Sequence, residues 1–269
     1  MKAAERFRAR GTQKIRDKDA SDAPLATGDK ERDERQVMEL AKKIGEYQDI
    51  FYAEHRRKIL IVLQGMDTSG KDGTIRKVFG ELDPLGVRCV SFKVPTTVER
   101  EHDFLWRIHK EVPGQGEMAI FNRSHYEDVL VPAVHGLIGD KERKRRYAQI
   151  RDFEHMLAEN GTVLLKFFLH ISKAEQKKRL EARLANPDKH WKVDPNDLAE
   201  RQYWNDYQQM YDKAIHETDA DHAPWYVIPA DSKDHRNLAI GSIVVETMKE
   251  MKLAYPPPNE AYFKVKVPD

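Results

Sequence analysis

The chain has 269 residues, of which 40% are hydrophobic, and this is enough for one sizeable α/β core. Its 46 basic and 45 acidic residues leave a formal net charge of +1, which argues against a globally basic nucleic-acid-binding protein. No run of about 18 apolar residues is present, so the sequence predicts no membrane-spanning helix and no membrane partner.

The predicted elements alternate between strands and helices along the chain. Residues 1–33 are highly charged and almost without large apolar residues, which is typical of a mobile arm without a signal peptide. An amphipathic helix over 36–56 comes next. Apolar runs then predict five strands, at 58–64, 87–95, 116–124, 162–172 and 225–230. Helices are predicted at 73–82, 96–112, 140–160 and 233–252, and at both ends of the charged stretch 173–218.

Such alternation predicts a parallel sheet covered by helices on both faces. We expect a single domain over 34–255, followed by a C-terminal extension over 256–269. Cys89 is the only cysteine and falls in the second predicted strand, where we expect it to be buried. A lone cysteine forms no internal disulfide, so we expect a reducing, cytoplasmic setting.

A glycine-rich loop follows the first strand and opens a helix. Its glycines and Lys71 fit the spacing G-x-x-x-x-G-K, in which backbone N–H groups and the helix N-terminus cradle phosphate. The predicted cradle comprises Gly65, Met66, Thr68, Ser69, Gly70, Lys71, Asp72 and Gly73. Asp67 lies inside it, although phosphate repels a carboxylate unless a divalent cation lies between them or the carboxylate acts on the nucleophile. Asp72 either belongs to the site or only favours the helix dipole.

A second polar cluster follows the third strand, in "FNRSHYEDVLV" (121–131). Ligands of open parallel sheets bind outside the carboxyl ends of the strands, so Asn122 and Arg123 should lie near the glycine-rich loop. Glu127 or Asp128 could supply the carboxylate that a phosphate-loop enzyme needs for its metal. The alternative is a solvated helix cap.

Three motifs in this order, "GMDTSGKDGTIR", "FNRSHYEDVLV" and "NPDKHWK", resemble the polyphosphate kinase 2 family over about Val37–Met251. The resemblance implies a P-loop kinase fold similar to thymidylate kinase, with a helical lid over about 173–205. It implies reversible transfer of the terminal phosphoryl group of inorganic polyphosphate to a nucleoside mono- or diphosphate (AMP/ADP or GMP/GDP), with the triphosphate used in reverse. It further implies Mg²⁺, with Mn²⁺ as an alternative, and a homodimer or homotetramer.

The resemblance also implies roles for single residues. Asp67 acts at the attacking oxygen or its metal, and Asp128, with Glu127, holds Mg²⁺, so these three are the predicted metal ligands. Arg123 clamps phosphate beside Lys71, and Arg179 and Arg183 close over the transition state from a lid in which they are solvated when it is open. The predicted nucleotide-binding residues are Asn122, Arg123, Tyr126, Glu127, Lys189, Lys192 and Asp194.

A polyphosphate donor needs a basic groove rather than a basic protein. The predicted groove comprises Lys71, Arg76, Lys77, Lys93, Arg100 and Arg123, although Arg76 and Lys77 also suit a solvated helix face. The charged stretch 173–205 equally suits a solvated face if no phosphate loop lies opposite. Two functions remain as alternatives at this point: an ATP-dependent nucleotide kinase of the thymidylate kinase kind, and a nucleotide-gated binding protein without catalysis.

Overall fold

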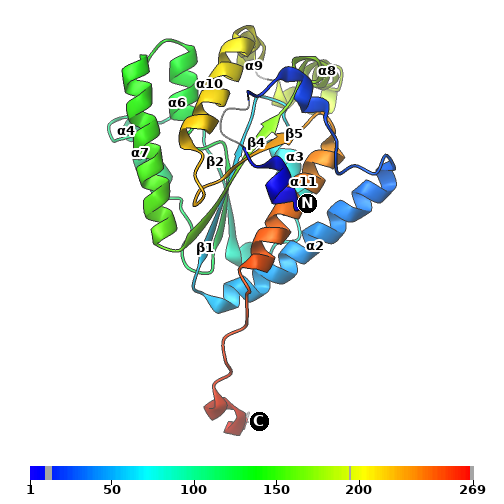
Figure 1. Ribbon diagram of the computed structural model, residues 1–269, viewed down its shortest axis with the longest axis vertical. Coiled ribbons are helices and arrows are strands. Elements are labelled where there is room, and N and C mark those ends of the chain that lie inside the picture. Colours follow the sequence, from blue (N-terminus) through cyan, green and yellow to red (C-terminus); the bar gives the residue numbers. More distant parts are fainter. Residues whose placement is uncertain (10–13, 194, 267–269) are drawn as a thin grey trace.

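The computed structural model describes residues 1–9, 14–193 and 195–266. In these ranges five parallel strands form one sheet in the order β2-β3-β1-β4-β5 (Figure 1). The strands are β1 Lys58–Gln64, β2 Val87–Ser91, β3 Met118–Asn122, β4 Thr162–His170 and β5 Trp225–Pro229. The predicted five-stranded parallel sheet is therefore confirmed, and β1 lies at its centre because its continuous apolar run can be buried on both faces.

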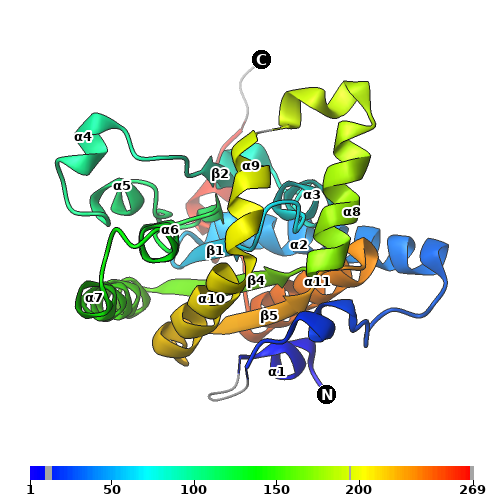
Figure 2. The same cartoon turned by 90° about the horizontal axis from the view of Figure 1, so that it is seen from above.

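Two hydrophobic cores cover the two faces of the sheet. Leu60 and Val62 of β1 point into one core and Ile59, Ile61 and Leu63 into the other, as the two-residue period of a strand requires. The helices on the first face are α6 Glu127–Val134, α7 Asp140–Glu159 and α10 Trp204–Thr218. The helices on the second face are α2 Lys30–Glu54, α3 Lys71–Val78 and α11 Lys233–Glu250 (Figure 2).

The segment 173–203 projects beyond the carboxyl ends of the strands (Figures 1 and 2). It contains α8 Lys173–Leu184, the 3₁₀ turn η3 Pro187–Lys192, α9 Pro195–Glu200 and the 3₁₀ turn η4 Arg201–Tyr203. Gln176 of α8 donates to the backbone oxygen of Asp67 in the loop after β1, so this segment begins beside that loop.

The beginning of the chain is packed against the domain, which corrects the expectation of a mobile arm. The short helix α1 Ala3–Phe7 buries both of its terminal residues, and the carboxylate of Glu246 in α11 accepts from the backbone N–H groups of Ala3 (2.8 Å) and Ala4 (2.9 Å). Arg8 forms an antiparallel bridge with Tyr226 of β5. A few small contacts at intervals, rather than an apolar run, therefore hold this polar segment in place.

Two further expectations are corrected around β2. The helix predicted over 96–112 is divided into α4 Thr97–Arg100 and α5 Trp106–His109, because Asp103 accepts from the N–H of Leu105 and interrupts the helix with a turn. Cys89 is exposed, since β2 is the edge strand of the sheet.

The chain beyond α11 leads away from the domain. Residues 253–259 extend from its lower end, and the turn η5 Glu260–Lys264 follows (Figure 1). The hydroxyl of Tyr255 donates to Asp49 at the root of this segment. Among the described residues, none of the helices combines the length and apolar character that crossing a bilayer requires.

Candidate active site

The glycine-rich loop runs from the carboxyl end of β1 into α3. Gly65 must be glycine, because a Cβ there would lie 2.7 Å from the carbonyl oxygen of Leu169 in β4. Thr68 has a positive φ of 61°, which is unusual for a residue with a side chain. The first backbone hydrogen bond of α3 runs from the N–H of Thr74 to the carbonyl oxygen of Gly70. The N–H groups of the first helical turn therefore have no acceptor within the helix and can bind a ligand. The loop thus has the donors that an anion cradle needs.

Lys71 is folded back onto the loop and is buried. Its Nζ donates to the carbonyl oxygens of Gly65 (2.7 Å) and Met66 (3.4 Å). Burial lowers the pKa of Lys71, and the charge of Arg123 lowers it further, while Asp67 and Glu127 act in the opposite direction. A phosphate group would supply the negative charge that this buried ammonium lacks.

Two of the carboxylates that the sequence singles out, Asp67 and Glu127, converge on Arg123. Asp67 Oδ1 lies 2.7 Å from one guanidinium nitrogen, and Glu127 Oε2 lies 3.6 Å from another. Arg123 leaves β3 with a positive φ of 63°, and such outliers are concentrated at functional sites. Asn122, one residue earlier, donates to Asp72 Oδ1 at 2.8 Å. The structure therefore joins the loop to the β3 cluster as predicted, and it answers why the loop tolerates Asp67: an arginine neutralises it.

Asp128 lies apart from this pair. Its carboxylate is bound by Arg107 at 2.9 Å, and its backbone oxygen accepts from Arg146. Burial raises the pKa of Asp128, while Arg107 opposes this shift. Of the three predicted metal ligands, the structure thus brings only Asp67 and Glu127 together at Arg123.

Two carboxylates suffice for the metal that the resemblance implies. Mg²⁺ binds one or two carboxylates and fills its other positions with water and phosphate oxygens. Asp67 and Glu127 supply ligands of that kind beside the loop, and burial raises the pKa of Glu127 against the effect of Arg123. In the described part of the chain, no three His, Cys, Asp or Glu side chains form a metal-binding group, so phosphate oxygens would have to complete the site.

Tyr126 does not face the site, contrary to the prediction that it binds nucleotide. Its side chain is fully buried, and its hydroxyl lies 2.9 Å from Glu154 and 2.9 Å from Thr218. Lys166 Nζ lies 2.6 Å from Glu154 and donates to the hydroxyl of Tyr126 as well. Tyr126 is therefore part of a buried polar network beneath α6, and its position beside Arg123 in the sequence gives no sign of this.

Replacing Tyr126 by Phe tests this correction. The change removes only the hydroxyl, and Lys166 keeps Glu154 and the carbonyl of Thr218 as partners. We expect the free energy of unfolding to fall by about 1 kcal/mol, while the KM for nucleotide changes less than about two-fold. Denaturant unfolding and steady-state kinetics measure both. A rise in KM at unchanged stability would instead indicate that Tyr126 binds the nucleotide.

Arg179 also differs from its prediction as a solvated lid residue. Its guanidinium donates to the carbonyl oxygens of Thr68 (2.9 Å), Ala230 (2.8 Å) and Asp231 (2.7 Å), and its Nε donates to Glu175 (2.8 Å). Only 11% of its side chain is exposed. Arg179 thus ties α8 to the back of the phosphate loop, whereas Arg183, one turn further on, is partly exposed.

Several of the remaining predicted residues are exposed. The exposed ones are Asp72, Arg76, Lys77, Lys93, Arg100 and Lys189. Gly73 lies in the first turn of α3, and Met66 and Ser69 are buried in the loop. Asp194 and the side chain of Lys192 lie outside the described part of the chain.

Two arginines near the site are absent from the sequence predictions. Arg107 holds Asp128 and lines a pocket of about 420 Å³ together with Arg100, Arg145 and Arg146. Arg236, in the first turns of α11, donates to the carbonyl of Ser69. The only sequence signal for Arg236 is its place just after the fifth strand, at the ligand edge of the sheet.

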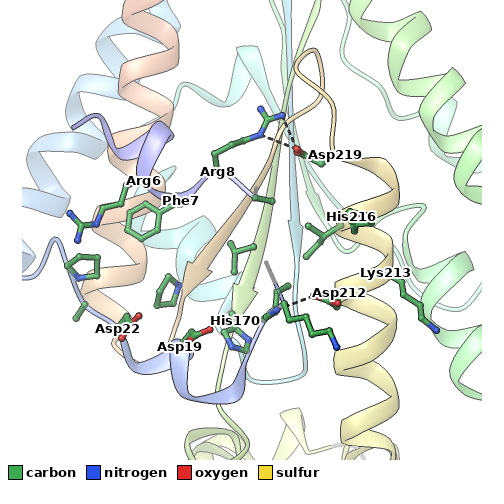
Figure 3. Close-up of a pocket in the computed structure, with 18 residues that line it drawn as sticks. Arg6, Phe7, Arg8, Asp19, Asp22, His170, Asp212, Lys213, His216 and Asp219 are labelled. Atoms are coloured by element: carbon green, nitrogen blue, oxygen red, sulfur yellow. Dashed lines mark hydrogen bonds and ion pairs between the residues drawn. The ribbon is translucent and has the colours of Figure 1, made fainter. Parts of the chain in front are cut away.

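A larger pocket of about 910 Å³ lies elsewhere, between the N-terminal segment, α10 and β5 (Figure 3). Its wall includes Phe7, His170, Asp212 and Asp219. None of the predicted site residues lines it, and its cationic and acidic side chains are balanced. We therefore place the chemistry at the phosphate loop, where the charged groups converge.

The chain is similar to known proteins over most of its length. The family model described as "Polyphosphate kinase 2 (PPK2)" matches residues 27–256. The chain is 48% identical over 247 residues to an AMP/ADP-polyphosphate phosphotransferase of Meiothermus ruber, with 92% of each chain covered. It is 42% identical over 227 residues to an ADP-polyphosphate phosphotransferase of Rhodopseudomonas palustris, covering 80% of this chain and 78% of that one.

A solved structure extends the comparison to the fold. The crystal structure of a polyphosphate kinase 2 from Arthrobacter aurescens superposes with a TM-score of 0.93 at 41% identity, and it covers 96% of this chain and 93% of that one. The arrangement of strands and helices around the phosphate loop is thus shared with that structure.

Proposed function

The chain belongs to the polyphosphate kinase 2 family, and on that premise we propose that it transfers the terminal phosphoryl group of inorganic polyphosphate to a nucleoside mono- or diphosphate. The observation that supports this most directly is the cluster of Asp67, Arg123 and Glu127 beside Lys71. A phosphate loop alone serves many kinases. The loop carboxylate and the partly exposed Arg123 form an ion pair, and an incoming acceptor phosphate can separate it by binding the arginine.

The proposed step uses the residues of this cluster in turn. The N–H groups of the loop and Lys71 hold the terminal phosphates of the donor. The acceptor phosphate takes Arg123, and Asp67 then orients the attacking oxygen. That oxygen forms a bond to the terminal phosphorus while the bridging P–O bond breaks, so polyphosphate becomes one unit shorter. Catalysis of this kind is mostly positioning and charge neutralisation.

We propose that Asp67 and Glu127 hold Mg²⁺, or Mn²⁺ in its place, during this step. The ion supplies charge neutralisation between phosphate oxygens when it is bound. Arg107 already neutralises Asp128, so we assign Asp128 to the support of α6 and the neighbouring pocket rather than to direct contact with the metal.

Metal titrations of two matched variants distinguish these carboxylates. Glu127→Gln should raise the Mg²⁺ concentration for half-maximal rate by about ten-fold, since a direct ligand loses its charge. Asp128→Asn should lower the rate with a shift of less than about three-fold in that concentration. Initial rates across a range of Mg²⁺ concentrations provide the measurement. A larger shift for Asp128→Asn than for Glu127→Gln would reverse the assignment.

The segment 173–203 is proposed as the lid of the domain over 34–255. It stands over the carboxyl ends of the strands (Figure 2), and it carries Arg183 and Lys189. Closure would bring these cations to the transferred phosphate and exclude water. We further propose a cytoplasmic homodimer or homotetramer, as the family resemblance implies.

The test is an assay without ATP. Purified protein is mixed with Mg²⁺, polyphosphate and either AMP or ADP, and the nucleotides are separated by chromatography. ADP or ATP should form in amounts that follow the polyphosphate consumed. If product forms only when ATP replaces polyphosphate as the donor, the protein is an ordinary nucleotide kinase. Binding without turnover with either donor would contradict any kinase function.

A further inference from the structure

Arg236 lies directly behind the phosphate loop. It is 2% exposed, and its Nη1 donates to the carbonyl oxygen of Ser69 at 3.1 Å. Its Nε and Nη2 lie 3.3 and 3.0 Å from Oδ1 of Asn237. No ion pair between Arg236 and a carboxylate is found in the described ranges. Burial and the like charge of Arg179 lower the pKa of Arg236 to about 9. The charge of Asp234 acts in the opposite direction without forming an ion pair, and a buried cation without a paired carboxylate is costly, so its presence here calls for a reason.

The bond to Ser69 determines where one N–H group of the cradle points. Ser69 O accepts from Arg236 at 3.1 Å and from Arg179 at 3.4 Å. No cis peptide bond occurs among the described residues, and in a trans peptide the C=O and the following N–H point in opposite directions. Since both arginines hold this oxygen at the back of the loop, the N–H of Gly70 is turned toward the front, where phosphate binds.

Gly70 is in close contact with Arg236 and has a backbone conformation that favours glycine. Gly70 has a φ of 104°, and a Cβ on it would lie 2.0 Å from Nη1 of Arg236. Asn237 also accepts from the hydroxyl of Thr74 at 3.3 Å, which ties α11 to α3 beside the guanidinium. The glycine of the phosphate motif therefore makes room for a cation behind the loop, besides allowing the turn.

We propose that Arg236 is a positioning residue for the phosphoryl donor, which acts on bound polyphosphate through the loop and not by contact. It holds the Ser69–Gly70 peptide in the orientation for phosphate, and its buried charge attracts the polyanion through that peptide. This inference rests on the proposed function, because it concerns the donor of the same reaction.

The effect should be specific to the donor. A condensed phosphate chain carries about one charge per phosphate, so it gains more from a fixed cation behind the loop than an acceptor bound mainly at Arg123. The Ser69–Gly70 peptide is also part of the loop and not of the β3 cluster. Loss of Arg236 should therefore weaken donor binding and leave acceptor binding nearly unchanged.

Calorimetric titration with inorganic tripolyphosphate and, separately, with AMP or ADP tests the proposal. Arg236→Gln keeps a hydrogen-bond donor but loses the charge, and its affinity for tripolyphosphate should fall by about 10- to 100-fold. Arg236→Lys keeps the charge but loses the two-pronged hydrogen-bonding geometry of the guanidinium, and its affinity for tripolyphosphate should fall by about three- to ten-fold. Arg143→Gln serves as control, since Arg143 is 7% exposed on α7 and pairs with Asp140, and it should bind tripolyphosphate like the wild type.

Each result decides the matter. The proposal is overturned if Arg236→Gln binds tripolyphosphate within two-fold of the wild type, or if nucleotide affinity falls by the same factor. If Arg236→Gln does not fold, Arg236→Lys decides alone: wild-type affinity for tripolyphosphate overturns the proposal, and a selective loss supports it. A wild-type protein that fails to bind tripolyphosphate would refute the proposed function itself, and this inference with it.

Discussion

Replacing Asp67 by Asn is expected to lower the rate of phosphoryl transfer by about 10³-fold or more, equivalent to about 4 kcal/mol of transition-state stabilisation. The carboxylate lies inside an anion cradle and 2.7 Å from Arg123, so its charge is available at the point where donor and acceptor meet. The amide keeps the shape but removes the charge that orients the acceptor oxygen and the proposed metal. Steady-state kinetics with polyphosphate and ADP measure the loss.

The fold should survive this change. Arg123 retains Glu127 as a partner, and Asp67 is only partly buried, so the melting temperature should change by less than about 3 °C. Asp152→Asn, an exposed carboxylate on α7, is the matched control and should leave both rate and stability unaltered. A rate for Asp67→Asn within a few-fold of the wild type would remove Asp67 from the chemistry.

Replacing Arg179 by Ala should reduce stability and rate together. The guanidinium donates to carbonyl oxygens of the phosphate loop and of the segment after β5, and its loss leaves these acceptors without partners. We expect the free energy of unfolding to fall by about 3 kcal/mol, which lowers the melting temperature by about 6–12 °C. The rate should fall by at least about ten-fold, because the loop that holds the donor loses its support.

Arg183→Ala is the control for stability, since it lies one turn further along the same helix and is partly exposed. Its melting temperature should stay within about 2 °C of the wild type. Thermal melts of both variants, together with kcat and KM, provide the comparison. If both variants melt like the wild type, the contacts of Arg179 do not stabilise the fold, and the sequence-based prediction that Arg179 acts as a lid arginine is supported instead.

The backbone of the site could be predicted from the sequence because it depends on local patterns. A buried strand, a glycine spacing and a helix placed the loop, and the end of the third strand placed Asn122 and Arg123 beside it. The parallel direction of the strands needs no side-chain detail, since alternation of strands and helices predicts it, whereas the order of the strands was not predicted.

The side-chain contacts could not be predicted in the same way. Tyr126 and Asp128 lie in one short motif with Arg123, yet the rotation of α6 turns Tyr126 into the core and Asp128 toward Arg107. Arg179 stands in a run of charges that suits a solvated helix, and only the carbonyl oxygens opposite make it structural. Partners from distant segments decide such roles, and a single sequence does not show them.

The packed N-terminal segment has a consequence for how the chain reaches its native state. Asp17 accepts from the N–H of Lys173 at the start of α8, and Glu246 accepts from Ala3, so contacts span 156 and 243 residues. The contact of Ala3 with Glu246 therefore forms only after the chain has been synthesised through α11. Closing such long loops adds little entropy cost per residue, but these contacts can form only late in synthesis. Partly synthesised chains that end before Lys173 lack the contact of Asp17 with the start of α8, and those that end before Glu246 lack the contact that holds α1.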